Sequence, residues 1–362
     1  MARRVWCWAL VSAGALGLAG GAEQDAAKQQ SAIDKGLEWL AKAQARDGHW
    51  DAEGRRHATN ITARAGLALL MEGSTLREGK YSEHLRKAVD WLVERSQANG
   101  MLGDPNDRAE AKDYMEGHGF AMLFLASVYG QEKDGDRPKK LKDVLTRAVD
   151  FCGKAQTELG GWGFVSAKDG GGHDVGDIAV TQMQGLGACR NAGIAGTGPI
   201  LDKALKYLEK CTTPSGGVIF SLSTGRGGER PNLTVAALVC SYSAGQYDSA
   251  LVKKWITFCR DSIPVDNRFD RDGSGRYYFA QALHILGDNG FERLFPGSQP
   301  AERLTWSKYK KLIFPIGGQG QDGSWNSREG NVFSTTMNLT ILQLDSTTLP
   351  IYQRTAKEDA PK

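Results

Sequence analysis

The 362-residue sequence has little proline, cysteine or histidine, with 11, 6 and 6 residues of each. The shortage of proline, together with the lack of a Gly-X-Y period, excludes a collagen-like chain. No CxxC pair occurs and no His stands at ligand spacing from a Cys, so we expect no zinc site. The formal net charge is only +3, which argues against nucleic-acid binding through a basic face. With 41% hydrophobic and 24% charged residues, the composition is that of a folded globular chain.

An apolar run near the N-terminus is short for a membrane span. It covers residues 5–19, follows a basic start and precedes small residues that end at Ala22. A membrane-spanning helix needs about 20 apolar residues. This arrangement is typical of a secretory signal peptide. We therefore predict a signal over residues 1–22, and an exported protein, periplasmic or secreted, with no stable membrane span after cleavage.

Five cysteines remain after such a cleavage, and they lie in or at the end of apolar helical patterns. Their number is odd and their spacing is wide, so no disulfide framework is indicated. We expect them to be small buried hydrophobic residues. They are Cys152, Cys189, Cys211, Cys240 and Cys259.

Glycine is abundant, with 45 residues, and much of it follows a long internal repeat. Six segments combine an amphipathic helical pattern with a polar, Gly-rich turn. Their aromatic anchors are Trp39, Trp91, Phe151, Tyr207, Trp255 and Tyr309. The anchors recur about every 54 residues, which indicates a repeat array.

A second class of segment lies between these repeats and is apolar nearly all round. Most of its members end at a glycine, which suits a left-handed helix cap. They cover residues 60–73, 118–130, 177–193, 232–245, 277–287 and 331–344. A helix that is apolar on every side is buried on every side. We predict an all-α α6/α6 toroid, with six inner and six outer helices in one domain over residues 23–350, and a tail over residues 351–362. An open solenoid is the alternative.

The turn sequences carry a resemblance to a known family. Residues 35–50, KGLEWLAKAQARDGHW, resemble the QW motif of squalene cyclases, and weaker copies end at Trp162 and Trp325. The repeat array is similar to the terpenoid cyclase and protein prenyltransferase superfamily, whose members fold as α/α toroids. The resemblance implies that the Trp side chains brace the ends of neighbouring outer helices. It also implies an apolar or polyprenyl-like ligand in a central cavity.

The acid that the family's cyclases use is missing. Squalene cyclases protonate an alkene with the middle acid of a D-x-D-D motif at the start of an inner helix, and the matching segment here is D-V-G-D, residues 174–177. Gly176 occupies the position of the proton donor. The resemblance therefore leaves open whether the chain is an enzyme. Asp177 also has the character of a helix N-cap.

The metal sites of related families are also incomplete. Asp150 and Cys152 match two zinc ligands of prenyltransferase β subunits, but residues i and i+2 diverge on a helix, and the required His is absent. No DDxxD motif for magnesium and no GCGEQ thioester motif occurs. Residues 270–275 resemble a calcium loop, but Gln281 stands where an EF-hand has Glu, so an Asp/Gly turn is preferred. We expect no metal and no cofactor.

Polar and aromatic residues near the starts of the inner segments would ring one mouth of a toroid. Capping accounts for Asn and Asp at helix starts, whereas it does not call for imidazole or aromatic rings. The catalytic candidates are His173, Asp174 and Asp177. The ligand-binding candidates are Tyr114, His118, Phe120, Tyr277 and Tyr278.

Three functions follow from these features. The first is an exported toroid that binds an apolar or polyprenyl-like ligand. The second is a carbohydrate-active hydrolase or lyase, with Asp174 or Asp177 facing Asp113 or Glu116 across an open polar groove. The third is a non-catalytic interaction module with an unknown protein partner and no deep pocket. The shape and polarity of the central cavity discriminate among them.

Overall fold

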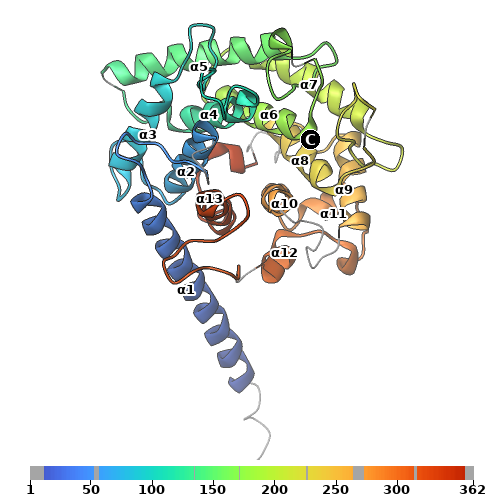
Figure 1. Cartoon of the computed structure of the whole chain (residues 1–362). Coiled ribbons are helices and arrows are strands. Elements are labelled where there is room, and N and C mark those ends of the chain that lie inside the picture. The colour runs from blue at the N-terminus through green and yellow to red at the C-terminus, as the bar shows by residue number, and fades with distance from the viewer. Residues whose placement is uncertain are drawn as a thin grey trace, which may run out of the picture.

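The computed structural model describes residues 12–52, 57–133, 135–170, 172–225, 227–263, 273–313 and 316–354. In these ranges the chain forms helices and isolated bridges, and no strand. The inner ring consists of α2 (Ala58–Met71), α4 (Tyr114–Val128), α6 (Gly176–Asn191), α8 (Pro231–Ser243), α10 (Ser274–Leu286) and α13 (Asn331–Leu342). The outer ring consists of α1 (Ser12–Lys42), α3 (Ser82–Glu94), α5 (Asp136–Ala155), α7 (Thr197–Cys211), α9 (Ala250–Ser262) and α12 (Trp306–Ile313). The predicted α6/α6 toroid is confirmed (Figure 1).

The inner ring is closed. Each inner helix contacts the next, and α13 contacts both α2 and α1. The open solenoid is therefore excluded. Shorter elements fill the loops: α11 (Gly290–Leu294), η1 (Ala167–Asp169), η2 (Pro300–Glu302) and η3 (Pro350–Tyr352). The N-terminal part of α1 extends away from the ring in Figure 1.

The helices of the two rings differ in how much of their surface is buried, as the hydropathy pattern predicts. Every residue of α2 is buried, whereas α7 buries one stripe that includes Leu201, Ala204 and Leu208. All five described cysteines are buried and free, which confirms that they are small core residues. No described helix is long and apolar enough to cross a membrane.

After five of the outer helices, a glycine turn leads to the following inner helix and packs against the next outer helix. Its φ lies between 93° and 105° at Gly48, Gly100, Gly160, Gly216 and Gly323. A Cβ atom at these positions would lie only 2.2 to 2.9 Å from a backbone carbonyl oxygen of the next outer helix. Both the backbone conformation and the lack of space therefore require glycine. The corresponding turn after α9 lies outside the described residues, as do residues 270–272 of the expected Asp/Gly turn at 270–275.

Glutamine side chains clamp three of these turns. Gln44 Nε2 donates to Gly48 O at 2.8 Å and to His84 O, in the first turn of α3, at 3.0 Å. Gln156 bonds in the same way to Gly160 and Ile200, and Gln319 to Gly323 and Ala32. Each clamp ties the end of one outer helix to the backbone of the next.

The Trp residues after the glycines are buried and structural. The indole Nε1 groups of Trp50 and Trp162 donate to carbonyl oxygens of the outer helix that precedes each, at 2.8 Å. The ring of Trp325 instead reaches the neighbouring outer helix, where a Cβ at Gly36 would lie 2.9 Å from it. The expected packing against a neighbouring helix thus occurs at Trp325, and the other two indoles bond to their own helix.

An inner-helix side chain holds each of four turns from inside. In three repeats a Thr hydroxyl accepts a turn N–H: Thr62 from Trp50, Thr234 from Val218 and Thr335 from Trp325. In α4 the acceptor is His118, whose Nδ1 accepts from Leu102 N at 3.0 Å. His118 is fully buried, and burial lowers its pKa to about 3. The imidazole therefore takes the structural place of a threonine.

Replacing a turn glycine tests whether the close carbonyl contact, in addition to the positive φ, requires glycine at these positions. Gly160→Ala adds a Cβ that collides with Lys203 O, whereas Gly193→Ala has a positive φ of 77° but open space. We expect G193A to cost about 1 to 2 kcal/mol of unfolding free energy from backbone strain alone. G160A should cost clearly more, as measured by urea denaturation. Equal losses in the two variants would contradict a role for the contact.

The buried His118 should make the protein acid-sensitive. Its folded pKa lies below the unfolded value of about 6.5, so this stabilisation is complete above pH 6.5 and decreases as the pH falls toward 3. His118→Thr should preserve the turn bond and reduce the slope of unfolding free energy against pH in this window by up to about 1.4 kcal/mol per pH unit. Denaturant titrations across the window measure the slope. His173→Thr, at an exposed position, is the matched control, and an unchanged slope in H118T would contradict the assignment.

Candidate functional site

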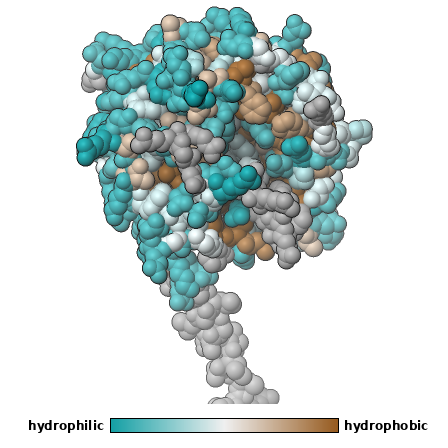
Figure 2. All heavy atoms as spheres, viewed as in Figure 1, coloured by the Kyte–Doolittle hydropathy of each residue, from teal (hydrophilic) through white to brown (hydrophobic). Residues whose placement is uncertain are grey.

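The N-terminal ends of all six inner helices surround a cavity of about 310 Å³. Its wall is contributed by Asn60, Ile61 and Arg64 of α2, Glu116 of α4, Asp177, Ile178 and Thr181 of α6, Asn232 of α8, Ser274 and Tyr278 of α10, and Phe333 of α13. Loop residues complete the rim: Ala52, His57, Phe164 and Glu329. The wall thus combines a guanidinium, several carboxylates and aromatic rings. Figure 2 shows a largely hydrophilic face with hydrophobic residues gathered over part of it.

The segment that follows α13 packs across the inner ring. After α13, the backbone continues to η3, which contacts α6 and α10. Ile351 and Tyr352, the first residues of the expected tail, are buried there. Burial and the neighbouring Tyr277 raise the pKa of Tyr352. Access to the cavity is thus from the side of the inner-helix N-termini.

Arg64 is held among aromatic rings at the cavity wall. Its Cζ lies 3.8 Å from the centroid of Phe120, 5.1 Å from that of Phe333 and 5.5 Å from that of Tyr277. A guanidinium over such faces is attracted by their quadrupoles, and more strongly when desolvated. Phe120 and Tyr277, two of the expected ligand-binding residues, thus lie around an arginine.

The polar contacts of Arg64 are incomplete. Nε donates to Asn60 Oδ1 at 2.8 Å, and Nη2 lies 3.7 Å from Glu116 Oε1. The residue is 7% exposed, and no described residue gives Nη1 a hydrogen-bond partner. Arg64 was not among the sequence candidates. The signal that could have found it is a lone basic residue within the otherwise apolar pattern of residues 60–73.

His57 and Asp113 form a second polar pair at the rim. His57 Nδ1 lies 3.5 Å from Asp113 Oδ2. With φ 55° and ψ 36°, His57 is the single non-glycine residue of positive φ in the described ranges. Such conformations concentrate at functional sites. The pair lines a small recess that shares His57, Asn60 and Glu116 with the central cavity.

The carboxyl group of Asp113 is electrostatically unusual. Burial raises its pKa, the adjacent His57 lowers it, and the carboxylates of Glu116 and Glu110 raise it again. The net effect is a raised pKa, because a partly buried carboxylate among other carboxylates resists ionisation. The sequence candidates included Asp113 and Glu116 only as partners in the hydrolase alternative, and His57 was missed.

Asp177 and Tyr278 lie on the same cavity. Asp177 is the exposed second residue of α6, and Tyr278 comes from α10. Burial raises the pKa of the Tyr278 hydroxyl, and the negative charges of Glu116 and Asp177 add to this effect. These two sequence candidates are therefore brought together with Glu116 and Arg64.

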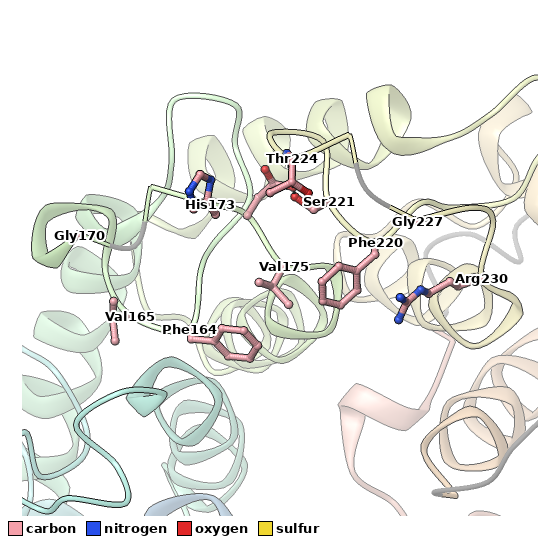
Figure 3. Close-up of a pocket in the computed structure, with 11 residues that line it drawn as sticks. Phe164, Val165, Gly170, His173, Val175, Phe220, Ser221, Thr224, Gly227 and Arg230 are labelled. Atoms are coloured by element: carbon pink, nitrogen blue, oxygen red, sulfur yellow. Dashed lines mark hydrogen bonds between the residues drawn. The ribbon is translucent and has the colours of Figure 1, made fainter.

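The other two catalytic candidates lie on a separate groove of about 570 Å³ (Figure 3). His173 is exposed there. The Asp174 carboxylate accepts from Leu222 N at 2.6 Å, Tyr207 Oη at 2.7 Å and Ser223 N at 2.8 Å. Burial raises the pKa of Asp174, but these bonds outweigh burial and lower it. Asp174 therefore ties the loop before α6 to the loop before α8.

Phe164 separates the groove from the cavity. It lines both, and it is 49% exposed, which is unusual for an aromatic ring. In Figure 3 it lies across Val175 from Phe220. Arg230 covers the Phe220 ring at 4.4 Å on the far side of the groove. The two hollows therefore share one exposed aromatic wall.

Neither of the remaining ligand candidates lines the central cavity, although Tyr114 lines the adjoining recess of His57 and Asp113. Tyr114 donates its hydroxyl to Asp169 Oδ2 at 2.5 Å and accepts from Ser166 N at 2.8 Å, so it fastens η1 to the start of α4. His118 faces the α3–α4 turn and the ring of Phe151, as its bond to Leu102 requires.

The structure gives a steric reason for the glycine at the cyclase acid position. A Cβ at Gly176 would lie 3.1 Å from Leu233 Cδ1, so a side chain there would point at α8. The backbone N–H of Gly176 donates to Phe220 O at 2.9 Å.

Among the described residues, no group of three or more His, Cys, Asp or Glu side chains could hold a metal ion.

Comparison with known proteins identifies the fold. No family model matches the chain, and no curated protein matches it. An inactive α-1,6-mannanase variant from Salegentibacter sp. in complex with α-1,6-mannotetrose is 9% identical, with a TM-score of 0.63 over 87% of this chain and 98% of that one. A variant of the type II terpene cyclase MstE from Scytonema, in complex with merosterolic acid A, is 13% identical, with a TM-score of 0.56 over 88% of this chain and 97% of that one. An α-amylase from Clostridium perfringens is 10% identical, with a TM-score of 0.52 over 86% and 97%. The chain thus shares its α/α toroid with terpene cyclases and glycoside hydrolases.

Proposed function

We propose that this protein is a carbohydrate-active hydrolase that binds a saccharide at the N-terminal mouth of its inner ring. The observation that carries the proposal is the charged cavity itself. Asp113, a carboxyl group of raised pKa, lies beside a cavity that also bears Glu116 and Asp177. A carboxyl group of raised pKa near a second carboxyl group is the pairing that glycosidic bond hydrolysis needs.

The same wall disfavours the apolar or polyprenyl-like ligand that the family resemblance implies. An apolar chain in the cavity would remove water from Arg64, Glu116 and Asp177 without replacing its hydrogen bonds. Burying polar groups unpaired costs roughly 1 to 3 kcal/mol each, and charged groups cost more. Sugar hydroxyls, in contrast, both donate and accept. The polarity of the wall therefore supports the carbohydrate alternative.

The exposed ring of Phe164 adds a second feature suited to sugars. A pyranose presents an apolar C–H face as well as hydroxyls, and an exposed aromatic ring is a surface for the former. Phe164 lies between the charged cavity and the largely apolar groove that also bears His173 and Ser221. A saccharide could thus extend from the cavity across Phe164 into the groove.

The residues suggest a reaction with two carboxyl groups. Protonated Asp113 would donate its proton to the glycosidic oxygen as the bond from that oxygen to the anomeric carbon breaks. Asp177 would take a proton from the water that attacks the anomeric carbon. The products are two shorter saccharides, and Asp113 regains a proton from solvent. Glu116 would keep Asp113 protonated through its negative charge.

Hydrolysis assays with purified full-length chain test this proposal. A panel of neutral and acidic oligosaccharides, in α and β linkages, is scored for new reducing ends. We expect release from at least one member, and a loss of at least about 100-fold in kcat for Asp113→Asn and Asp177→Asn. Asp150→Asn, on the exposed face of α5, is the matched control. Release from no saccharide, together with a rise in Tm on adding geranylgeraniol, would overturn the proposal in favour of the polyprenyl ligand.

Substitutions beside Asp113 should shift the pH profile in opposite directions. The acid must be protonated to act, so activity falls as the pH rises through its pKa. Glu116→Gln removes a charge that raises this pKa, so the alkaline limb of kcat/KM should move to lower pH. His57→Gln removes a charge that lowers it, so the limb should move to higher pH. Shifts of the same sign in both variants would contradict Asp113 as the acid.

A further inference from the structure

Arg64 is a buried cation with an unused donor. It is 7% exposed and lines the central cavity. Its Nη1 group is buried, and no described residue gives it a hydrogen-bond partner. Buried guanidinium N–H groups are normally satisfied, because leaving one unpaired costs free energy. Phe120 supports one face of the group at 3.8 Å, which fixes its plane. A ligand acceptor in the cavity would complete its hydrogen bonds.

The helix N-termini contribute positive potential at this depth, against the negative charges of the wall carboxylates Glu116, Asp177 and Glu329. Six inner helices direct their N-termini at the cavity, and each terminus carries about half a positive charge. Glu116 lies 3.7 Å from Nη2, which is longer than a hydrogen bond. The other carboxylates on the wall, Asp177 and Glu329, are exposed at the rim, where water and salt screen them.

We propose that Arg64 binds an anionic group on the saccharide, and that this group is the carboxylate of a uronic acid. The inference rests on the proposed function and names its substrate class as an acidic oligosaccharide. A planar guanidinium matches a carboxylate through paired N–H donors. A sulfate ester shares this chemistry, and the experiment separates the two.

Binding measurements at constant ionic strength test the assignment. The probes are trigalacturonate, the same trisaccharide with its carboxyl groups reduced to alcohols, a sulfated galactose trisaccharide, and sodium sulfate. Isothermal titration uses the full chain and the variants Arg64→Met, Glu116→Gln and Arg95→Met. Arg95 is the matched control, because it also lies over an aromatic ring, that of Trp91 at 4.3 Å, but does not line the cavity.

We expect the wild type to bind trigalacturonate roughly 10 to 100-fold more tightly than its reduced form, the range that one charged hydrogen bond supplies. R64M should lose this preference, and R95M should keep it. E116Q should increase it, because the competing carboxylate is gone. E116Q keeps Arg64 in place. Its preference for the charged trisaccharide therefore tests the role of Arg64 even if R64M does not fold.

Other results separate this inference from the proposed function. Equal binding of the charged and reduced trisaccharides overturns the role of Arg64 and leaves a saccharide site. Tighter binding of the sulfated trisaccharide overturns the uronate assignment. If no saccharide binds but sulfate does so in an Arg64-dependent manner, the uronate assignment fails and anion binding by Arg64 stands. If no probe binds, the role of Arg64 is overturned, while the hydrolysis panel decides the proposed function separately.

Discussion

One close backbone contact recurs around the outer ring, and the rest of the structure depends on it. At each described turn a glycine lies so near a carbonyl oxygen of the next outer helix that no Cβ fits between them. In three turns a glutamine bonds to both sides of this contact. The contact sets the spacing of successive outer helices, and hence the radius at which the inner helices pack. Closure of α13 on α2 follows from that spacing.

A ring of this radius brings six helix N-termini around one small space, where charged residues of different repeats meet. Elsewhere in the repeats, equivalent positions carry equivalent residues, such as the threonines that accept the turn N–H groups. At the cavity the repeats differ, and α2 and α4 contribute the residues that depart most from the pattern. Arg64 lies among aromatic rings, and Asp113 lies among carboxylates. Both groups are partly removed from water, which strengthens whatever electrostatic contact a ligand makes with them.

The candidate site could be predicted only in part, for a definable physical reason. Asp177 and Tyr278 were found because polar and aromatic residues at the start of an apolar helix need an explanation. His118 was chosen by the same argument, although it acts as a buried acceptor in place of threonine. Asp174, two residues before α6, binds the next loop instead. In a helix that is apolar all round, the hydropathy pattern does not indicate which residues face the centre of the ring. The sequence therefore did not predict that Arg64 lines the cavity or that Phe120 packs against it.

The sequence by itself favoured the toroid over an open solenoid, because a repeat of about 54 residues alternates amphipathic helices with helices that are apolar, and hence buried, on every side. The contact of α13 with α2 decided that the ring closes. The sequence also indicated the turn glycines, whose conformation is set locally along the chain. The glutamine clamps between neighbouring outer helices appeared only in the structure. Only the tertiary structure decided which polar residues meet. The cavity joins residues as distant in sequence as His57 and Phe333, and the rotation of each buried helix about its axis depends on the packing of both neighbours.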